Sequence, residues 1–133
     1  MRVECDNQFS IVGPKDKLHA LWSRASKKGL LEAICPIGEW NFYDALVNWG
    51  CSNAEDVDMT IQDLSDDRAE INGKFKSYIN TPLEAFEHYG ERNKDVSIML
   101  KHYGTSGYND FWGTWTTDKG LHDYGMKKGK LYA

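Results

Sequence analysis

The chain has 133 residues, enough for one domain with its own hydrophobic core and too few for most large enzyme architectures. Hydrophobic residues make up 41% of it and charged residues 27%, a globular composition that argues against intrinsic disorder. The net charge of −4 disfavours a dedicated binder of duplex DNA or anionic membranes, which needs a basic excess. No run approaches the roughly 18 apolar residues of a membrane span, and the charged N-terminus is unlike a signal peptide, so we expect a cytoplasmic protein.

The first half of the chain shows one strand pattern followed by two helix patterns. Residues 3–11 alternate between apolar and polar side chains, which predicts a half-buried strand with Asn7 as a polar residue on its inner face. A helix is predicted over residues 14–29, because apolar side chains recur at helical spacing between a proline and a glycine. After a short connection, a small helix is predicted over residues 42–49, with Phe42 on its inner face.

The second half is richer in strands. Residues 56–64 and 69–79 alternate on either side of a polar turn and predict a hairpin. Thr81 and Pro82 are typical of the N-cap and first residue of a helix, which should continue to Arg92. Further strands are expected from Val96 to Leu100, over residues 111–116, and in a last segment ending near Tyr124.

This order of elements indicates an α+β fold. Without the small helix it reads β-α-β-β-α-β, the split βαβ or ferredoxin-like arrangement, with an added edge strand. We therefore predict an antiparallel sheet with two main helices on one face and an extra C-terminal strand. Residues 1–125 should form this single domain and residues 126–133 a basic tail. The predicted core contains Phe9, Ile11, Leu21, Trp22, Phe75, Phe86, Ile98 and Phe111.

Residues with catalytic or metal-binding chemistry are present, but not in a pattern that assigns a reaction. The three cysteines form no C-x-x-C pair and are expected to be reduced and buried. The four histidines do not have ligand spacing, and the acids show only a solvated face rather than a catalytic pair. The segment from Gly104 to Gly107 could cradle an anion or form a simple turn. The sequence therefore predicts no metal, no cofactor and no enzyme.

Acidic residues are concentrated between residues 55 and 70, where seven acids accompany one base, Arg68. Such a surface could meet a basic surface on a partner, because complementary charge speeds and orients association. It could equally serve solubility alone. The acidic candidates for partner binding are Asp56, Asp58, Asp63, Asp66 and Asp67.

Aromatic side chains gather near the C-terminus, and Tyr108 and Trp112 among them are further candidates for partner binding. Phe111 and Trp115 fall on one face of the predicted strand and Trp112 on the other, so Trp112 should point away from the helices. There it could stack on the bases of a single-stranded nucleic acid, bind a protein, or be covered by the extra strand and the tail.

Four short motifs together resemble a known family. They are Cys5-Asp6-Asn7 with Gly13, then Pro36 with Trp49-Gly50, then Asn80-Thr81-Pro82, and finally Tyr103, Gly107, Phe111, Trp112 and Gly113. In this order they resemble the YubB ferredoxin-like domain of phage and conjugative-plasmid proteins. The resemblance implies a ferredoxin-like fold and an accessory gene of a mobile element, and it implies no reaction.

We therefore predict a phage- or plasmid-encoded protein that acts in the host cytoplasm by binding and inhibiting a host protein with a basic surface. The target would be a defence complex, as for an anti-CRISPR or another anti-defence protein, or a nucleic-acid-handling complex. The alternative is a module that binds single-stranded nucleic acid on the open face of its sheet.

Overall fold

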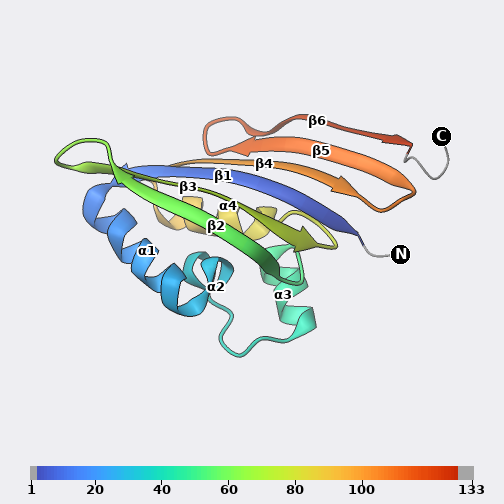
Figure 1. The fold of residues 1–133 in the computed structure, drawn as a ribbon, viewed down its shortest axis with the longest axis horizontal. Helices are drawn as coiled ribbons and strands as arrows, with labels where there is room; N and C mark the ends of the chain where they lie inside the picture. Colours follow the sequence, from blue (N-terminus) through green and yellow to red (C-terminus); the bar gives the residue numbers. More distant parts are fainter. Residues whose placement is uncertain (1–2, 129–133) are drawn as a thin grey trace.

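The computed structural model describes residues 3–128, which form an α+β fold with one open antiparallel sheet of six strands and four helices (Figure 1). The strands are β1 (Glu4–Pro14), β2 (Ala54–Asp63), β3 (Arg68–Tyr78), β4 (Ser97–Thr105), β5 (Asn109–Thr116) and β6 (Gly120–Lys128). The helices are α1 (Lys15–Lys28), α2 (Leu30–Ile34), α3 (Phe42–Trp49) and α4 (Leu83–Arg92). The strand order in the sheet is β2-β3-β1-β4-β5-β6, and each neighbouring pair is antiparallel.

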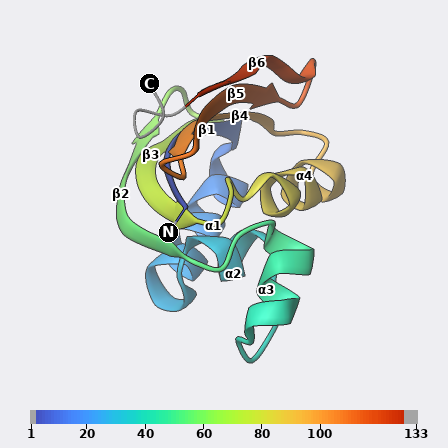
Figure 2. The same ribbon diagram turned by 90° about the vertical axis from the view of Figure 1, so that its right-hand side faces the viewer.

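The helices lie together on one side of the sheet, and the other side is open (Figures 1 and 2). α1 and α4 are the two longer helices that the sequence predicted, and α2 and α3 are shorter. Among the described residues, no helix has both the length and the apolar character that crossing a membrane would require.

Two strands extend the sheet beyond β4, where the predicted arrangement had one extra strand, although both segments were expected to be strands. β5 and β6 form a hairpin with each other, so the C-terminal part adds a pair of strands instead of one edge strand. β6 continues to Lys128 and therefore includes the first three residues, 126–128, of the predicted basic tail. The rest of that tail, residues 129–133, lies outside the described residues.

The core lies between the helices and the inner face of the sheet. β1 is the central strand, and the predicted alternation is confirmed: Phe9 and Ile11 are buried. Phe9 contacts Phe75 of β3 and Phe86 of α4, with ring centroids 5.8 Å and 5.5 Å away. Gly73, opposite Phe9 on β3, leaves room for this ring, because a Cβ there would lie 2.6 Å from it.

Two of the eight predicted core residues are not fully buried. Trp22 is half-buried and packs against the edge of the core. Phe111 faces the helix side, as expected, but lies on the part of β5 that extends past α4, and its ring covers Gly104 instead. The core position on β5 is taken by Trp115, which lies beside Gly90 of α4.

Asn7 has the structural role that was predicted for it. Its amide nitrogen donates to Ser77 Oγ at 2.8 Å, and its amide oxygen accepts from the Thr81 hydroxyl at 2.8 Å. Thr81 was expected to cap the following helix, and this is wrong, because Pro82 occupies the N-cap position without a side-chain cap. A buried amide oxygen needs a donor, and Thr81 supplies it.

Candidate functional site

The open face of the sheet carries a groove of about 820 Å³. Outward-facing residues of β1, β3, β4 and β5 form its floor, and outward-facing residues of β2 form one side. The side chains that line it include Asp6, Gln8, Asp58, Thr60, Asn72, Lys74, Met99, Lys101, Tyr103 and Trp112. The groove exists because this side of the sheet carries no helix (Figure 2).

Two stacked aromatic rings lie at the β4–β5 side of the groove. Tyr103 and Trp112 are direct partners in the β4–β5 register, and their rings are 6.3 Å apart and nearly parallel, at 12°. The Trp112 ring extends over Gly125 of β6, where a Cβ would lie 2.6 Å from it. The prediction that Trp112 points away from the helices is therefore confirmed.

A hydrogen bond fixes Tyr103 in this stack. Its hydroxyl donates to Asp110 Oδ2 at 2.9 Å, and this bond to a carboxylate raises the pKa of Tyr103. Tyr103 remains 44% exposed, so an aromatic edge and face stay available to a partner. The pair is thus held in place before any partner binds, which reduces the entropy lost on binding.

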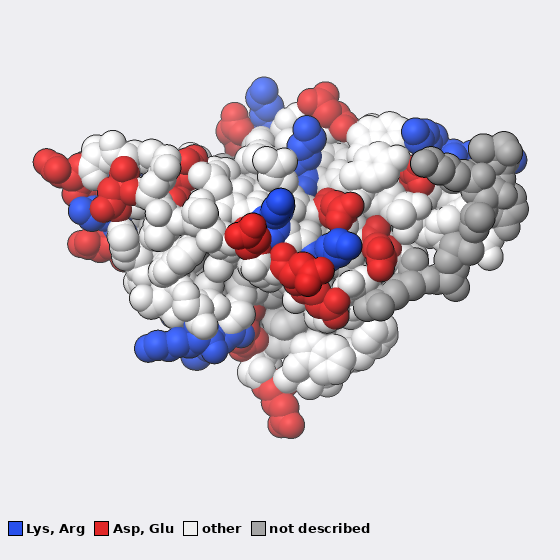
Figure 3. All heavy atoms as spheres, viewed as in Figure 1, with Lys and Arg blue, Asp and Glu red and all other residues white. Residues whose placement is uncertain are grey.

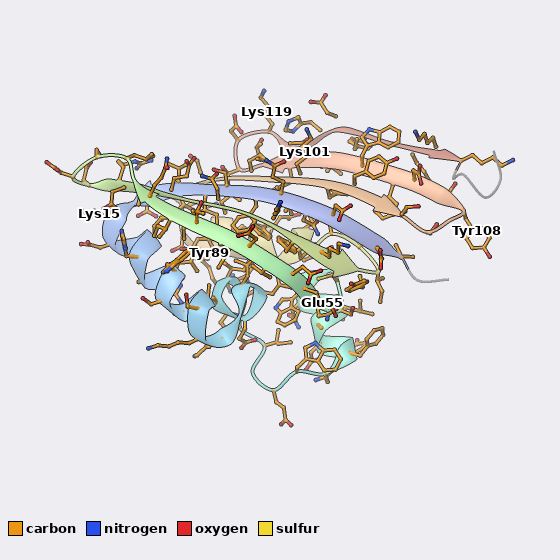
Figure 4. All side chains as sticks on the ribbon, viewed as in Figure 1. Lys15, Glu55, Tyr89, Lys101, Tyr108 and Lys119 are labelled. Carbon is orange, nitrogen blue, oxygen red and sulfur yellow. The ribbon has the colours of Figure 1, made fainter. Side chains whose placement is uncertain are left out.

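The charges in the groove are balanced. Asp6 and Asp58 supply two acids, and Lys74 and Lys101 supply two bases. Asp58 and Lys74 face each other across the β2–β3 ladder, and Lys101 projects from β4 on the side away from the helices (Figure 4). Figure 3 shows acidic and basic side chains side by side in the middle of the view.

The predicted acidic residues do not come together in one place. Asp58 lines the groove, and Asp56 lies in a β-bulge with φ of 53°, a backbone conformation that aspartate tolerates better than most residues. Asp66 and Asp67 lie in the turn of the β2–β3 hairpin, at the opposite end of β2. In Figure 3 this hairpin end is the red group at the left.

Asp63 faces the helix side and is bound to α1. Its carboxylate lies 2.7 Å from His19 Nε2 and 3.3 Å from Lys15 Nζ. The hydrogen bond from His19, followed by that from Lys15, lowers the pKa of Asp63. This acid therefore joins the hairpin to the start of α1 and is separated from the groove by the sheet.

Tyr108 also lies away from the groove. It is in the turn between β4 and β5, is 51% exposed, and points outward at the far end of the sheet (Figure 4). The segment around it is a turn that Ser106 closes, with its backbone nitrogen bonded to the Asn109 carbonyl at 3.1 Å. Of the seven predicted binding residues, only Asp58 and Trp112 line the groove.

The cysteines and histidines among residues 3–128 are described by their burial and their protein contacts. All three cysteines are free and buried. Within the described part of the chain, no three His, Cys, Asp or Glu side chains are grouped so as to hold a metal ion. His19 pairs with Asp63, His88 lies 3.1 Å from Arg92, and burial lowers the pKa of His102.

We expect the thiols of Cys5 and Cys51 to resist modification in the folded protein. Burial raises the pKa of each to about 12. Ellman's reagent at pH 8 should therefore label neither thiol until the chain is unfolded in guanidinium. Rapid labelling of either in the native protein would contradict this.

The same pKa shifts predict a loss of stability in alkali. Between the unfolded-state thiol pKa, ~8.5, and the folded-state value of about 12, the unfolded chain binds fewer protons. The free energy of unfolding should fall there by ~1.4 kcal/mol per pH unit for each thiol. Urea unfolding at pH values from 9 to 11 measures this. The free energy of unfolding should fall less steeply with pH in Cys51→Ala than in the original protein.

Sequence reasoning missed a second feature, an exposed apolar surface on α3. Phe42 was expected to face inward but is 51% exposed, and Tyr43 beside it is 73% exposed. Asn41 begins the helix by accepting a hydrogen bond from the Asp44 backbone nitrogen at 2.9 Å, and Ala45 and Trp49 are the buried residues of the helix. The Asn41–Asp44 spacing is a recognisable helix start, and it could have placed Phe42 in the first turn of the helix from the sequence.

Comparison of the chain with protein-family models, with curated proteins and with solved structures found no match.

Proposed function

We propose that this protein is a binding protein that holds a partner protein on the open face of its sheet, with Tyr103 and Trp112 as the main contacts. The observation that carries the proposal is the stacked, pre-positioned aromatic pair beside a groove of about 820 Å³. Aromatic residues fixed in a partly enclosed surface are typical of the residues that contribute most to protein–protein binding energy.

The charge of the groove supports a protein partner over a nucleic acid. A groove for single-stranded nucleic acid is normally basic along its length. Here Asp6 and Asp58 balance Lys74 and Lys101, and the whole chain has a net charge of −4. A protein surface with charges of both signs complements this arrangement. Single-stranded nucleic acid is the second candidate, favoured by the exposed aromatic pair with Lys101 on the same strand as Tyr103.

We further propose that the fold is of the ferredoxin-like class and that the protein serves a phage or plasmid. The order β2-β3-β1-β4 with antiparallel neighbours, connected through α1 and α4, supports the split βαβ arrangement. The four motifs that resemble the YubB ferredoxin-like domain support the genomic setting. On this basis the partner is a host protein, and binding inhibits a defence or nucleic-acid-handling complex.

Recovery of partners from a bacterial host tests the proposal. We expect the tagged protein to retain one stoichiometric host protein after nuclease treatment, and Trp112→Ala to lose it. With the purified partner, calorimetry should show a Kd at least tenfold higher for Trp112→Ala, corresponding to ~1.4 kcal/mol or more.

The matched control is Tyr124→Ala. Tyr124 is 67% exposed on β6, and its Cβ lies on the helix side of Gly113, opposite to Trp112. An equal loss of affinity in Trp112→Ala and Tyr124→Ala would contradict the proposed site. So would retention of the partner by Trp112→Ala. Nuclease-sensitive recovery of nucleic acid would favour the second candidate.

A charge reversal in the groove should slow association with the same partner. Asp58→Lys removes an acid from the groove, whereas Asp66→Lys changes the hairpin turn at the other end of β2. We expect only Asp58→Lys to reduce the association rate substantially, and more strongly at low salt because screening is weaker there. Melting temperatures of both variants should barely change, since both acids are exposed. A larger effect from Asp66→Lys would place the contact on the hairpin.

A further inference from the structure

A second surface, formed by α3 and the residue before its cap, has the properties of a protein-docking site. Four apolar side chains are exposed there: Trp40 at 53%, Phe42 at 51%, Tyr43 at 73% and Val47 at 56%. Their exposed area is on the order of 400 Å², which is in the range of the largest apolar patches on monomeric proteins. We call these four residues the α3 patch.

The α3 patch is fixed rather than adaptable. The indole nitrogen of Trp40 donates to the Ser52 carbonyl at 2.9 Å, which attaches Trp40 to the segment that leads into β2. On the inner side of α3, Ala45 and Trp49 are buried, and the Trp49 indole donates to the Cys35 carbonyl at 2.7 Å. Because the inner positions are filled, the helix cannot rotate to bury Tyr43 and Val47.

The charge around the α3 patch is acidic. From Gly29 to Asn53, the stretch that contains α3, the sequence has three acids and no Lys, Arg or His. Glu39 precedes Trp40 and is exposed, and Asp44 lies within α3. Glu55, at the start of β2, faces Lys76 in the β2–β3 register and accepts a hydrogen bond from the Tyr78 hydroxyl at 2.8 Å, so it belongs to the open face and not to the α3 patch.

Space-filling views agree with this distribution. In Figure 3 the surface at the position of α3 in Figure 1 is white with a red projection below it. The blue atoms at the same level lie to the left, at the end of α1, whose last turn contains Lys27 and Lys28. Arg92 of α4 lies on the Cys35 side of this region, where it affects the pKa of that thiol.

A second copy of this chain does not fit the α3 patch. A symmetric contact centred on the α3 patch would bring the Glu39 and Asp44 carboxylates of both copies near one interface without a base, and like charges close together are unfavourable. An area on the order of 400 Å² is also about half of what each partner buries in a stable interface. A partner with Lys or Arg on either side of an apolar stripe would pair with the acids and bury the apolar side chains.

We infer that the α3 patch binds an amphipathic, basic helix of a partner protein, with apolar residues against Trp40, Tyr43 and Val47 and with Lys or Arg beside Glu39 and Asp44. Helices in this mode insert residues spaced three and four apart into an apolar surface. The α3 patch is on the helix side of the molecule, so the inference is independent of the groove on the open face.

A synthetic peptide tests the inference. The probe is an 18-residue helix with Leu and Trp on one face and Lys elsewhere, and its matched control has Glu in place of each Lys. Calorimetry with the full chain should show binding of the Lys peptide and at least tenfold weaker binding of the Glu peptide. Hydrogen exchange should show protection by the Lys peptide at residues 40–49.

Variants distinguish binding at the α3 patch from non-specific electrostatic attraction. Tyr43→Ser with Val47→Ser should weaken binding at least tenfold, and Glu39→Lys should weaken it mainly at low salt. The control, Tyr124→Ser with Met126→Ser, removes two similarly exposed apolar residues from β6 and should bind normally. Circular dichroism should confirm that each variant is folded.

Three results would overturn the inference: unchanged binding in the α3 variants, protection confined to the open face, or equal binding of the Glu peptide. A concentration-dependent dimer that the Tyr43→Ser, Val47→Ser variant dissolves would also overturn it, because the occupant would then be a second copy.

Discussion

Phe86→Ala should lower the free energy of unfolding by ~3–5 kcal/mol. Phe86 is fully buried and is the large aromatic residue through which α4 contacts the sheet. Its ring lies 5.5 Å from Phe9 and 6.4 Å from Phe75, stacked on the latter at 2°. Truncation removes both contacts and leaves a cavity between helix and sheet, which rigid strands cannot close.

Urea unfolding followed by circular dichroism measures this loss. The control is Phe42→Ala, which removes the same side chain from a position that is 51% exposed. We expect the control to cost less than ~1 kcal/mol. Similar losses in the two variants, or a small loss in Phe86→Ala, would show that Phe86 does not join the two layers as described.

Asn7→Ala should cost ~3 kcal/mol, a large effect for a neutral polar side chain. Asn7 is 3% exposed, and its amide connects β1 with Ser77 of β3 and with Thr81, just before α4. Removing it leaves the buried Ser77 and Thr81 hydroxyls without this partner and opens a small cavity. Unsatisfied buried groups cost ~1–3 kcal/mol each.

A double-mutant cycle with Thr81→Val tests the specific bond. If the Thr81 hydroxyl donates to Asn7, the two losses in stability should sum to more than the loss in the double variant, by ~1 kcal/mol. If Thr81 instead capped α4, the two substitutions would be additive, and Thr81→Val would reduce helicity without depending on Asn7. Additivity would thus restore the role first predicted for Thr81.

The sequence alone determined most segments of this protein that become strands and helices, and which face of most strands is buried, but α2 was expected to be a short connection or strand. The alternation along β1, the hairpin of β2 and β3, and the opposite directions of Trp112 and Trp115 follow from a period of two residues, which is a local property of the chain. The same local rule identified Asn7 as a buried polar residue that needs partners.

Only the tertiary structure decided what covers each face. Phe111 has the orientation predicted, but α4 does not extend over it, so it stays half-buried. Phe42 lies on nearly the same side of α3 as Trp49, seven residues later, but it is in the first turn of the helix, where it stays 51% exposed. Asp63 was grouped with the other acids but contacts His19 and Lys15, which are more than forty residues away in sequence.

In the groove as well, the local pattern predicts the direction of a side chain, and the tertiary structure determines its neighbours. Trp112 could be assigned to the open face from its position in the strand, but its partner Tyr103 and the opposing Asp58 and Lys74 come from other strands. The register between strands brings these side chains together, and that register depends on the whole sheet, including the bulge in β2 that separates Asp56 from Asp58. Burial and proximity depend on contacts between distant segments, which a pattern within one segment does not contain.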